Sequence, residues 1–142
     1  MKLRIVVTIL CALGVGVSLG WYMRGTRVEA ASNRVYELRT YTSAEGKLPE
    51  LLARFRDHTV KLFEKHGMTN VGYWVPQAEP GHSNTLIYML SFPSKEAADK
   101  SWAAFRADPE WTKVRTESEV NGRLTTRVES VFLDPADFSP AR

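Results

Sequence analysis

The sequence predicts an α+β domain in which two helices cover one face of a four-stranded antiparallel sheet. Segments with strand and helix patterns follow one another in the order β-α-β-β-α-β, which is the ferredoxin-like arrangement. The length of 142 residues, with 44% hydrophobic and 25% charged positions, suits a single globular domain. The strand predicted at residues 84–92 is apolar on both faces. This pattern indicates that the sheet face without helices also packs against a partner.

The first half of this order rests on two contrasting patterns. Residues 34–42 are rich in β-branched and aromatic side chains and alternate in polarity, which predicts a strand. Leucine and aromatic residues then recur at helical spacing over residues 47–66, which predicts an amphipathic helix. Pro49 suits the first turn of that helix, and Gly67 suits its C-terminal cap.

The next segments predict a hairpin. Residues 70–75 and 84–92 have strand composition, and the link between them at residues 76–83 contains two prolines and a glycine. Two helices can cover only one face of the resulting sheet. We therefore expect the other face to pack on a second copy of the chain, which makes a homodimeric α/β barrel.

The last segments complete the pattern. Ser94 is placed to cap a second helix that runs to about residue 107. Asp108, followed by Pro109, caps a further helical segment that Gly122 ends. Residues 124–133 predict the last strand.

The N-terminal segment predicts a targeting signal or a membrane anchor. Residues 5–23 carry no charge and follow two basic residues, and Trp21 and Tyr22 suit a membrane interface. An uncleaved signal anchor is favoured by this length; a signal peptide cleaved before Ala31 is the alternative. We expect a domain outside the cytoplasm, either anchored in the cell envelope or periplasmic or secreted after cleavage. The chain then divides into 1–31, the domain at 32–133, and a tail at 134–142.

Charge and cysteine content exclude several classes of function. Residues 1–31 hold four basic residues and one acidic residue, which leaves fifteen of each sign in the remainder. That balance argues against a nucleic-acid partner. Cys11 is the only cysteine, so the body of the chain has no internal disulfide and no thiolate metal site.

Three residues of the first strand are candidates for a site. If Tyr36 and Leu38 pack under the helices, Glu37, Arg39 and Tyr41 point into the space between the two sheets. The opposite facing of this strand is the alternative, because alternation alone does not decide which face lines the barrel. Charged residues are rarely buried unless they are paired, so two interpretations are open. Glu37 and Arg39 form a structural ion pair, with each other or with charges on the last strand. Alternatively, Arg39 holds a substrate carboxylate or enolate and Tyr41 donates a hydrogen bond to it.

Further candidates come from histidine and aromatic residues. His58 borders the apolar stripe of the first helix and is either a partly buried core residue or a residue that binds haem or substrate. Trp74 and Tyr88 belong to an aromatic set that forms the core or receives a small hydrophobic ligand. No metal-binding motif is present in the sequence, and we expect no cofactor, with haem as the alternative through His58.

Four short segments in order resemble NIPSNAP-domain proteins. They are YELRTY at 36–41 followed by GKL at 46–48, VGYW at 71–74, NTLIY at 84–88 and DPEW at 108–111. The resemblance covers residues 34–133 and implies membership of the dimeric α/β-barrel superfamily. That superfamily includes haem enzymes, cofactor-free monooxygenases and isomerases, so the resemblance implies a fold more directly than an activity.

Two classes of function are therefore open. The first is a homodimer that binds a small ligand or a protein partner without catalysis, with a membrane contact through residues 5–23 if the leader is retained. The second is a cofactor-independent monooxygenase or isomerase that works in a pocket of the barrel. The first is favoured because no nucleophile–base pair or metal constellation can be read from the chain. Whether the protein is an enzyme is left open.

Overall fold

The computed structural model describes residues 34–77 and 83–141, which belong to one compact unit, Ala31–Arg142. The predicted leader, including residues 5–23, and part of the hairpin link lie outside the described residues. Within the described ranges no helix is long and apolar enough to cross a membrane. The elements in chain order are β1 (Val35–Ser43), α1 (Leu48–Arg54), η1 (Phe55–Thr59), α2 (Val60–Lys65), β2 (Thr69–Trp74), β3 (Thr85–Phe92), α3 (Lys95–Ala107), α4 (Pro109–Ser118) and β4 (Thr125–Leu133).

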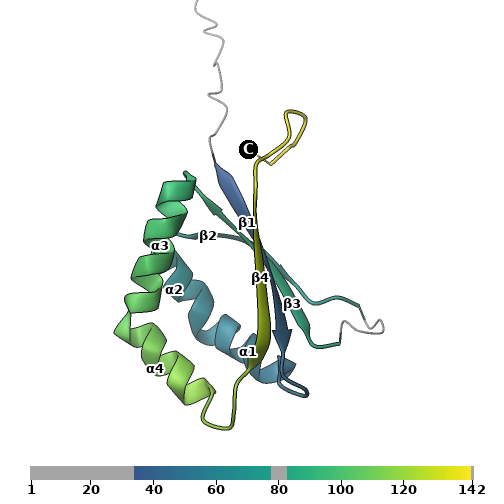
Figure 1. Ribbon diagram of the computed structural model, residues 1–142, viewed down its shortest axis with the longest axis vertical. Coiled ribbons are helices and arrows are strands. Elements are labelled where there is room, and N and C mark those ends of the chain that lie inside the picture. The colour runs from purple at the N-terminus through teal and green to yellow at the C-terminus, as the bar shows by residue number, and fades with distance from the viewer. Residues whose placement is uncertain (1–33, 78–82, 142) are drawn as a thin grey trace, which may run out of the picture. The chain divides into compact units, whose positions relative to one another are not determined.

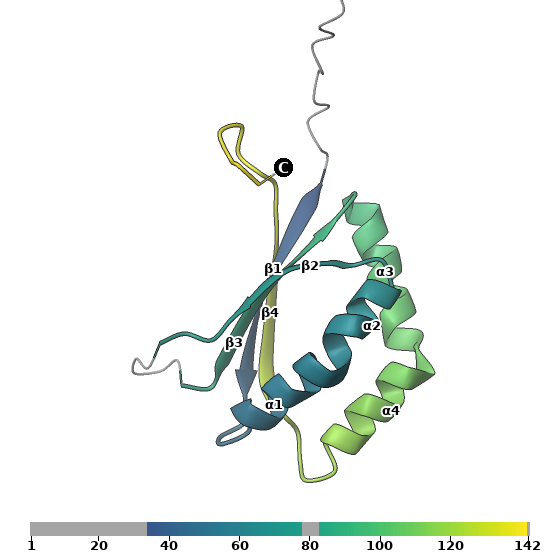
Figure 2. The same ribbon diagram turned by 180° about the vertical axis from the view of Figure 1, so that it is seen from behind.

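The four strands form one antiparallel sheet in the order β2-β3-β1-β4. All the helices lie on one side of this sheet, as the front and back views show (Figures 1 and 2). This confirms the predicted ferredoxin-like α+β fold, with each strand within about a residue of its expected bounds. In the register, Arg39 of β1 lies opposite Tyr88 of β3 and opposite Ser130 of β4.

The first helix differs from the prediction of one regular helix over residues 47–66. It runs as α1, η1 and α2, and η1 is a π-helical segment in which the Val60 N–H donates to the Phe55 carbonyl. The Thr59 hydroxyl donates to the carbonyl oxygen of Arg54 at 3.2 Å. The extra residue in this turn keeps Arg54, Phe55 and Thr59 all buried. Heptad-like spacing in the sequence does not reveal such a bulge.

The predicted caps of the later helices are confirmed. The Ser94 hydroxyl accepts from the backbone N–H of Ala97 at 3.2 Å, and Oδ1 of Asp108 accepts from that of Glu110 at 2.8 Å. Oδ2 of Asp108 also lies 2.7 Å from Nε2 of His66 and 2.8 Å from Nζ of Lys65. Asp108 therefore joins the end of α2 to the start of α4.

The core lies between the sheet and the helices. Leu86, Tyr88, Leu90 and Phe92 alternate along β3 and are almost completely buried. Aromatic rings from every layer meet there, and neighbouring ring centroids such as those of Phe63 and Phe105 lie 5.0 Å apart. Burial of these large apolar side chains supplies most of the drive for the helices to cover this face.

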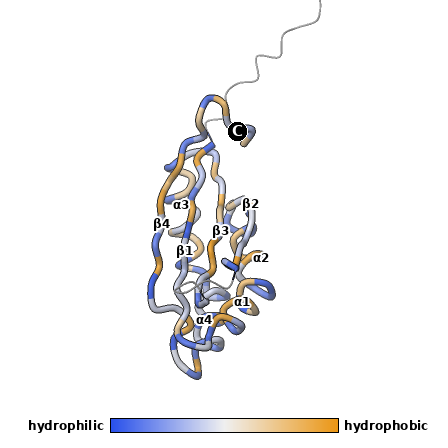
Figure 3. Tube along the Cα trace, turned by 90° about the vertical axis from the view of Figure 1, so that its right-hand side faces the viewer, coloured by the Kyte–Doolittle hydropathy of each residue, from blue (hydrophilic) through white to orange (hydrophobic). Residues whose placement is uncertain are grey.

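The other face of the sheet is open, and it is viewed in Figure 3 with the helices behind the strands. Its residues alternate with the core residues, and apolar side chains from all four strands lie among polar ones such as Thr40, Arg127 and Glu129. The apolar residues include Tyr36, Leu38, Trp74, Ile87, Met89, Val131 and Leu133. Trp74 and Val131 are each about half exposed in the single chain, at 50% and 49%.

The assumed facing of the first strand was wrong. Tyr36 and Leu38 lie on the open face, whereas Glu37, Arg39 and Tyr41 lie under the helices. Cross-strand pairing explains this, because Glu37 and Arg39 are opposite the core residues Leu90 and Tyr88. The charged side chains are tolerated there because they bond to each other and to core aromatic residues, as described below.

Candidate functional site

Glu37 is a buried carboxylate whose two oxygens are both satisfied. Oε1 accepts from Nη1 of Arg39 at 2.6 Å and from the Ser130 hydroxyl. Oε2 accepts from Nε1 of Trp102 on α3 at 2.6 Å. This confirms the predicted ion pair between Glu37 and Arg39. The pair ties the central strand β1 to α3 and to the edge strand β4.

Arg39 is held in a fixed orientation but is only partly hydrogen bonded. Its guanidinium carbon lies 4.3 Å from the centre of the Trp102 ring and 5.7 Å from that of Tyr41. Its Nε is buried and has no hydrogen-bond partner in the described part of the chain. Burial alone lowers the pKa of Arg39, but the neighbouring oxygens of Tyr88, Tyr41 and Glu37 raise it by more. Arg39 is thus a permanent, partly buried cation with an unused buried donor.

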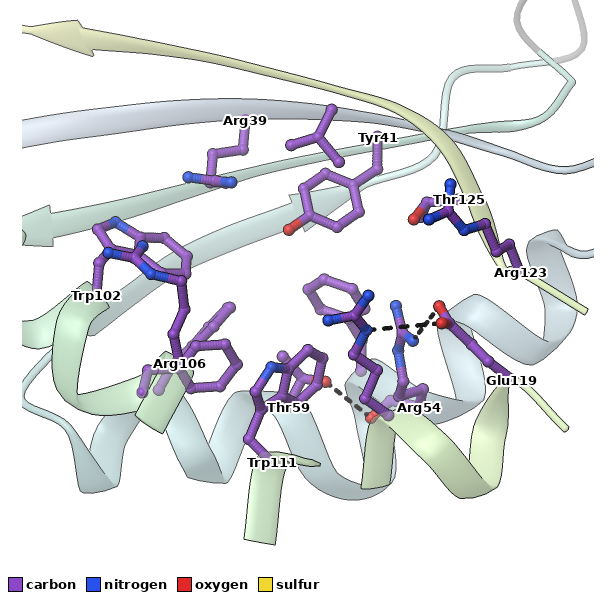
Figure 4. Close-up of a pocket in the computed structure, with 15 residues that line it drawn as sticks. Arg39, Tyr41, Arg54, Thr59, Trp102, Arg106, Trp111, Glu119, Arg123 and Thr125 are labelled. Carbon is purple, nitrogen blue, oxygen red and sulfur yellow. Dashed lines mark hydrogen bonds and ion pairs between the residues drawn. The ribbon is translucent and has the colours of Figure 1, made fainter. Parts of the chain in front are cut away.

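A cavity of about 300 Å³ lies beside Arg39, between the sheet and the helices (Figure 4). Arg39 and Tyr41 project into it from β1, and the facing wall comes from α1, η1, α2, α3 and α4. Six aromatic residues line it: Tyr41, Phe55, Phe63, Trp102, Phe105 and Trp111. Five arginines do so as well: Arg39, Arg54, Arg106, Arg115 and Arg123. Its volume is at the small end of the range for ligand pockets.

Arg54 is the second buried arginine of the cavity. The end of α1 and the π-helical turn direct it inward, and its side chain is only 4% exposed. Its Nη1 donates to Oε1 of Glu119 at 3.1 Å, and its guanidinium lies 5.3 Å from the centre of the Trp111 ring. Its Nε, like that of Arg39, is buried without a partner among the described residues.

Tyr88 supports the cavity from behind. It is fully buried, and its ring packs against Tyr41 at 5.3 Å and Phe55 at 5.2 Å. Burial, with the nearby Tyr41 hydroxyl, raises its pKa well above the usual value for a phenol. Tyr88 therefore remains neutral.

The structure brings together four of the six predicted site residues. Arg39 and Tyr41 line the cavity, while Glu37 and Tyr88 stand directly behind them. The prediction that His58 is a partly buried core residue was wrong, because it lies exposed on the outer surface of η1, in a shallow hollow between α1 and α4. Trp74 lies on the open face. The geometry therefore does not join His58 to Arg39 and Tyr41.

Sequence reasoning missed the arginines that the helices contribute. Arg54 looks like a surface residue of an amphipathic helix, and Arg106 and Arg115 look like ordinary solvated charges. Only the packing of α1, α3 and α4 shows that they face one cavity. Within residues 34–77 and 83–141 no group of three or more His, Cys, Asp or Glu residues is placed to hold a metal ion.

Comparisons with known proteins agree with this architecture. The chain is similar to a NIPSNAP family protein of unknown function from Agrobacterium tumefaciens, with 27% identity, a TM-score of 0.67, and coverage of 78% of this chain and 96% of that one. It is also similar to an uncharacterised NIPSNAP domain protein from Burkholderia xenovorans, with 26% identity, a TM-score of 0.64, and coverage of 75% and 98%.

A more distant structure shares the fold alone. It is SnoaB from Streptomyces nogalater, described as a cofactor-independent oxygenase, with 17% identity, a TM-score of 0.51, and coverage of 76% and 98%. No curated protein matches this chain. The model of the NIPSNAP family matches residues 36–140, which is most of the sequence. The chain belongs to the NIPSNAP family.

Proposed function

We propose that this protein is a homodimer that binds a small organic molecule in the cavity between its sheet and its helices. One observation carries the proposal: Arg39, beside a cavity of about 300 Å³, has a buried Nε donor without a partner among the described residues. Unsatisfied buried donors are uncommon in folded proteins, and an absent ligand is one explanation for them. A purely structural ion pair needs no such space.

The open face supports the homodimer. Its apolar side chains come from all four strands, and monomeric soluble proteins rarely expose large contiguous apolar patches. Self-association through this face buries it in a symmetric interface. The open face and the cavity use different side chains, so one protein can both form the dimer and bind the ligand.

Export of the domain is also part of the proposal. It rests on the uncharged run at residues 5–23 and the basic residues before it. A membrane contact through this run applies only to a chain that retains it.

Native mass spectrometry of the full chain, expressed with its own N-terminus and released in a mild detergent, tests the dimer and the ligand. We expect the mass of a dimer together with a small bound molecule. The subunit mass shows whether residues 1–30 have been removed by cleavage before Ala31. A monomer without a bound molecule contradicts both the dimer and the ligand.

Cofactor-independent oxygenation is the second candidate function. The specific observation in its favour is that a buried cation, Arg39, and a phenol, Tyr41, line the same cavity and are suited to stabilise an enolate. Oxygen uptake by the protein with its co-purified molecule tests this. Uptake that is lost in Arg39→Met supports oxygenation, whereas no uptake leaves simple binding as the function.

A further inference from the structure

The cavity has a strong imbalance of charge. Five arginines line it, and the only acidic residue in its lining is Glu119. Glu119 is already occupied, because it pairs with Arg54 at 3.1 Å and with Arg115 at 3.6 Å. Glu37 offsets Arg39 from behind the wall. Even with both carboxylates counted, the surroundings of the cavity are net positive, whereas the body of the chain as a whole is neutral.

Two arginines at the rim of the cavity contribute positive charge that no acidic residue in the described part of the chain neutralises. Arg106 at the end of α3 and Arg123 before β4 make no ion pair with any residue of the described ranges. Both are exposed, so water solvates them and a charge there has little cost. Their position favours the entry of an anion through electrostatic attraction.

The buried arginine donors indicate the chemistry of the ligand more directly than the arginines at the rim. Nε of Arg39 and Nε of Arg54 are both buried without a partner, and both side chains line the cavity. In each case a carboxylate of the protein engages Nη1, which leaves another edge of the planar guanidinium unused. Such an edge is suited to a carboxylate, which accepts two parallel hydrogen bonds from it.

The remaining walls select for a flat molecule. Trp102 and Trp111 lie under the guanidinium groups of Arg39 and Arg54, and Tyr41 and Phe55 close the space between them. A volume of 300 Å³ equals about ten molecules of liquid water. This space accommodates one or two aromatic rings.

We propose that the ligand of this cavity is a small aromatic acid, whose carboxylate binds the free edge of Arg39 and whose ring packs among Trp102, Trp111 and Tyr41. This inference rests on the proposed function and names the chemical class of its ligand. Arg54, fixed by Glu119, forms the second cationic wall. The inference replaces the expectation of a merely hydrophobic ligand.

Isothermal titration of the full-length protein in mild detergent tests the inference, with 2-naphthoate as the probe and 2-naphthamide as its neutral isostere. We expect the acid to bind at least ten times more tightly than the amide, with an affinity that falls as salt is added. Equal binding of acid and amide overturns the acid but leaves the cavity as a ligand site. No binding of either probe at millimolar concentration overturns both the inference and the ligand site.

Variants locate the binding group. Arg39→Met is expected to weaken naphthoate at least tenfold and to leave naphthamide unchanged. Arg56→Met is the matched control, because Arg56 is an exposed arginine of η1 that does not line the cavity. If Arg39→Met fails to fold, the double variant Glu37→Gln/Arg39→Met removes the whole ion pair and takes its place. Naphthoate affinity that is the same in these variants as in Arg56→Met contradicts the role of Arg39.

Discussion

The two faces of β1 reverse the usual relation between polarity and coverage by helices. The face under the helices carries Glu37, Arg39 and Tyr41, whereas the face without helices carries Tyr36 and Leu38. This contrast is confined to β1. On β3 the face under the helices carries the core residues Tyr88 and Leu90, and on β4 the open face carries the Arg127–Glu129 pair as well as Val131. A face that is covered but polar is typical of a site, and one that is uncovered but apolar is typical of an interface. The difference assigns separate roles to the two faces.

The largest expected effect comes from the same chemical change on adjacent residues of β3. Leu90→Asp places a carboxylate in the completely buried core, and we expect the domain not to fold. Truncation of a buried leucine alone costs about 2–5 kcal/mol, and an unpaired charge adds to this. Circular dichroism and thermal unfolding provide the measurement.

Met89→Asp is the matched change on the open face. We expect the domain to remain folded but to become a monomer in light scattering, because Met89 is only partly buried and faces away from the helices. A folded Leu90→Asp protein contradicts the assignment of the core face. A dimeric Met89→Asp protein contradicts the open face as the dimer interface.

The next comparison uses two ion pairs of the same kind. Glu37 and Arg39 are separated by two residues on β1, and Arg127 and Glu129 are separated by two on β4, each with an N–O distance of 2.6 Å. The first pair is under the helices, and the second is exposed on the open face. Removal of Glu37 by substitution with Gln leaves the buried Arg39 uncompensated, so we expect a loss of about 3 kcal/mol of unfolding free energy.

The corresponding Glu129→Gln change is expected to cost less than about 1 kcal/mol, because water screens the exposed pair. Urea unfolding of the two single variants, and of Arg39→Met and Glu37→Gln/Arg39→Met, gives both costs and the coupling energy between Glu37 and Arg39. Equal costs for the two glutamates indicate that burial does not distinguish the pairs.

The sequence predicted much of the fold because local signals marked each element. Alternation marked β1, and the caps Ser94 and Asp108 marked the starts of α3 and α4 correctly. These signals depend on neighbouring residues only, so they can be read from the chain without knowledge of the packing.

The same signals could not predict which face of β1 the helices cover. Alternation shows that Glu37 and Arg39 share a face, but polarity normally decides which face is buried, and here it indicates the wrong one. Burial of this pair depends on Trp102 and Ser130, which are distant in the sequence. The inward position of Arg54 depends on the π-helical turn, for which the spacing of residues gives no signal. The parts that could not be predicted are those that form the cavity.

The smallest effect on stability is expected from a change in the helix layer. This layer forms one wall of the cavity but takes no part in the open face. Asp108 accepts hydrogen bonds from Lys65, His66 and the backbone of Glu110, and these hold its pKa far below the usual value. A carboxylate whose pKa is depressed by folding stabilises the protein above its unfolded pKa of about 3.9, and this contribution is lost as the pH falls toward the folded pKa. Asp108→Asn therefore lowers the melting temperature at pH 7, and its difference from the parent protein narrows below about pH 4.

Thermal melts of both proteins between pH 7 and pH 2 measure this difference. Asp99→Asn is a suitable control, because Asp99 pairs with Lys95 on the exposed surface of α3. That control is expected to have little effect at any pH. Because Asp108 joins α2 to α4, which carries Trp111, its loss is expected to weaken ligand binding in the cavity without changing the oligomeric state. A change in oligomeric state instead shows that the open face also depends on the helix layer, and the separation of the two faces does not hold.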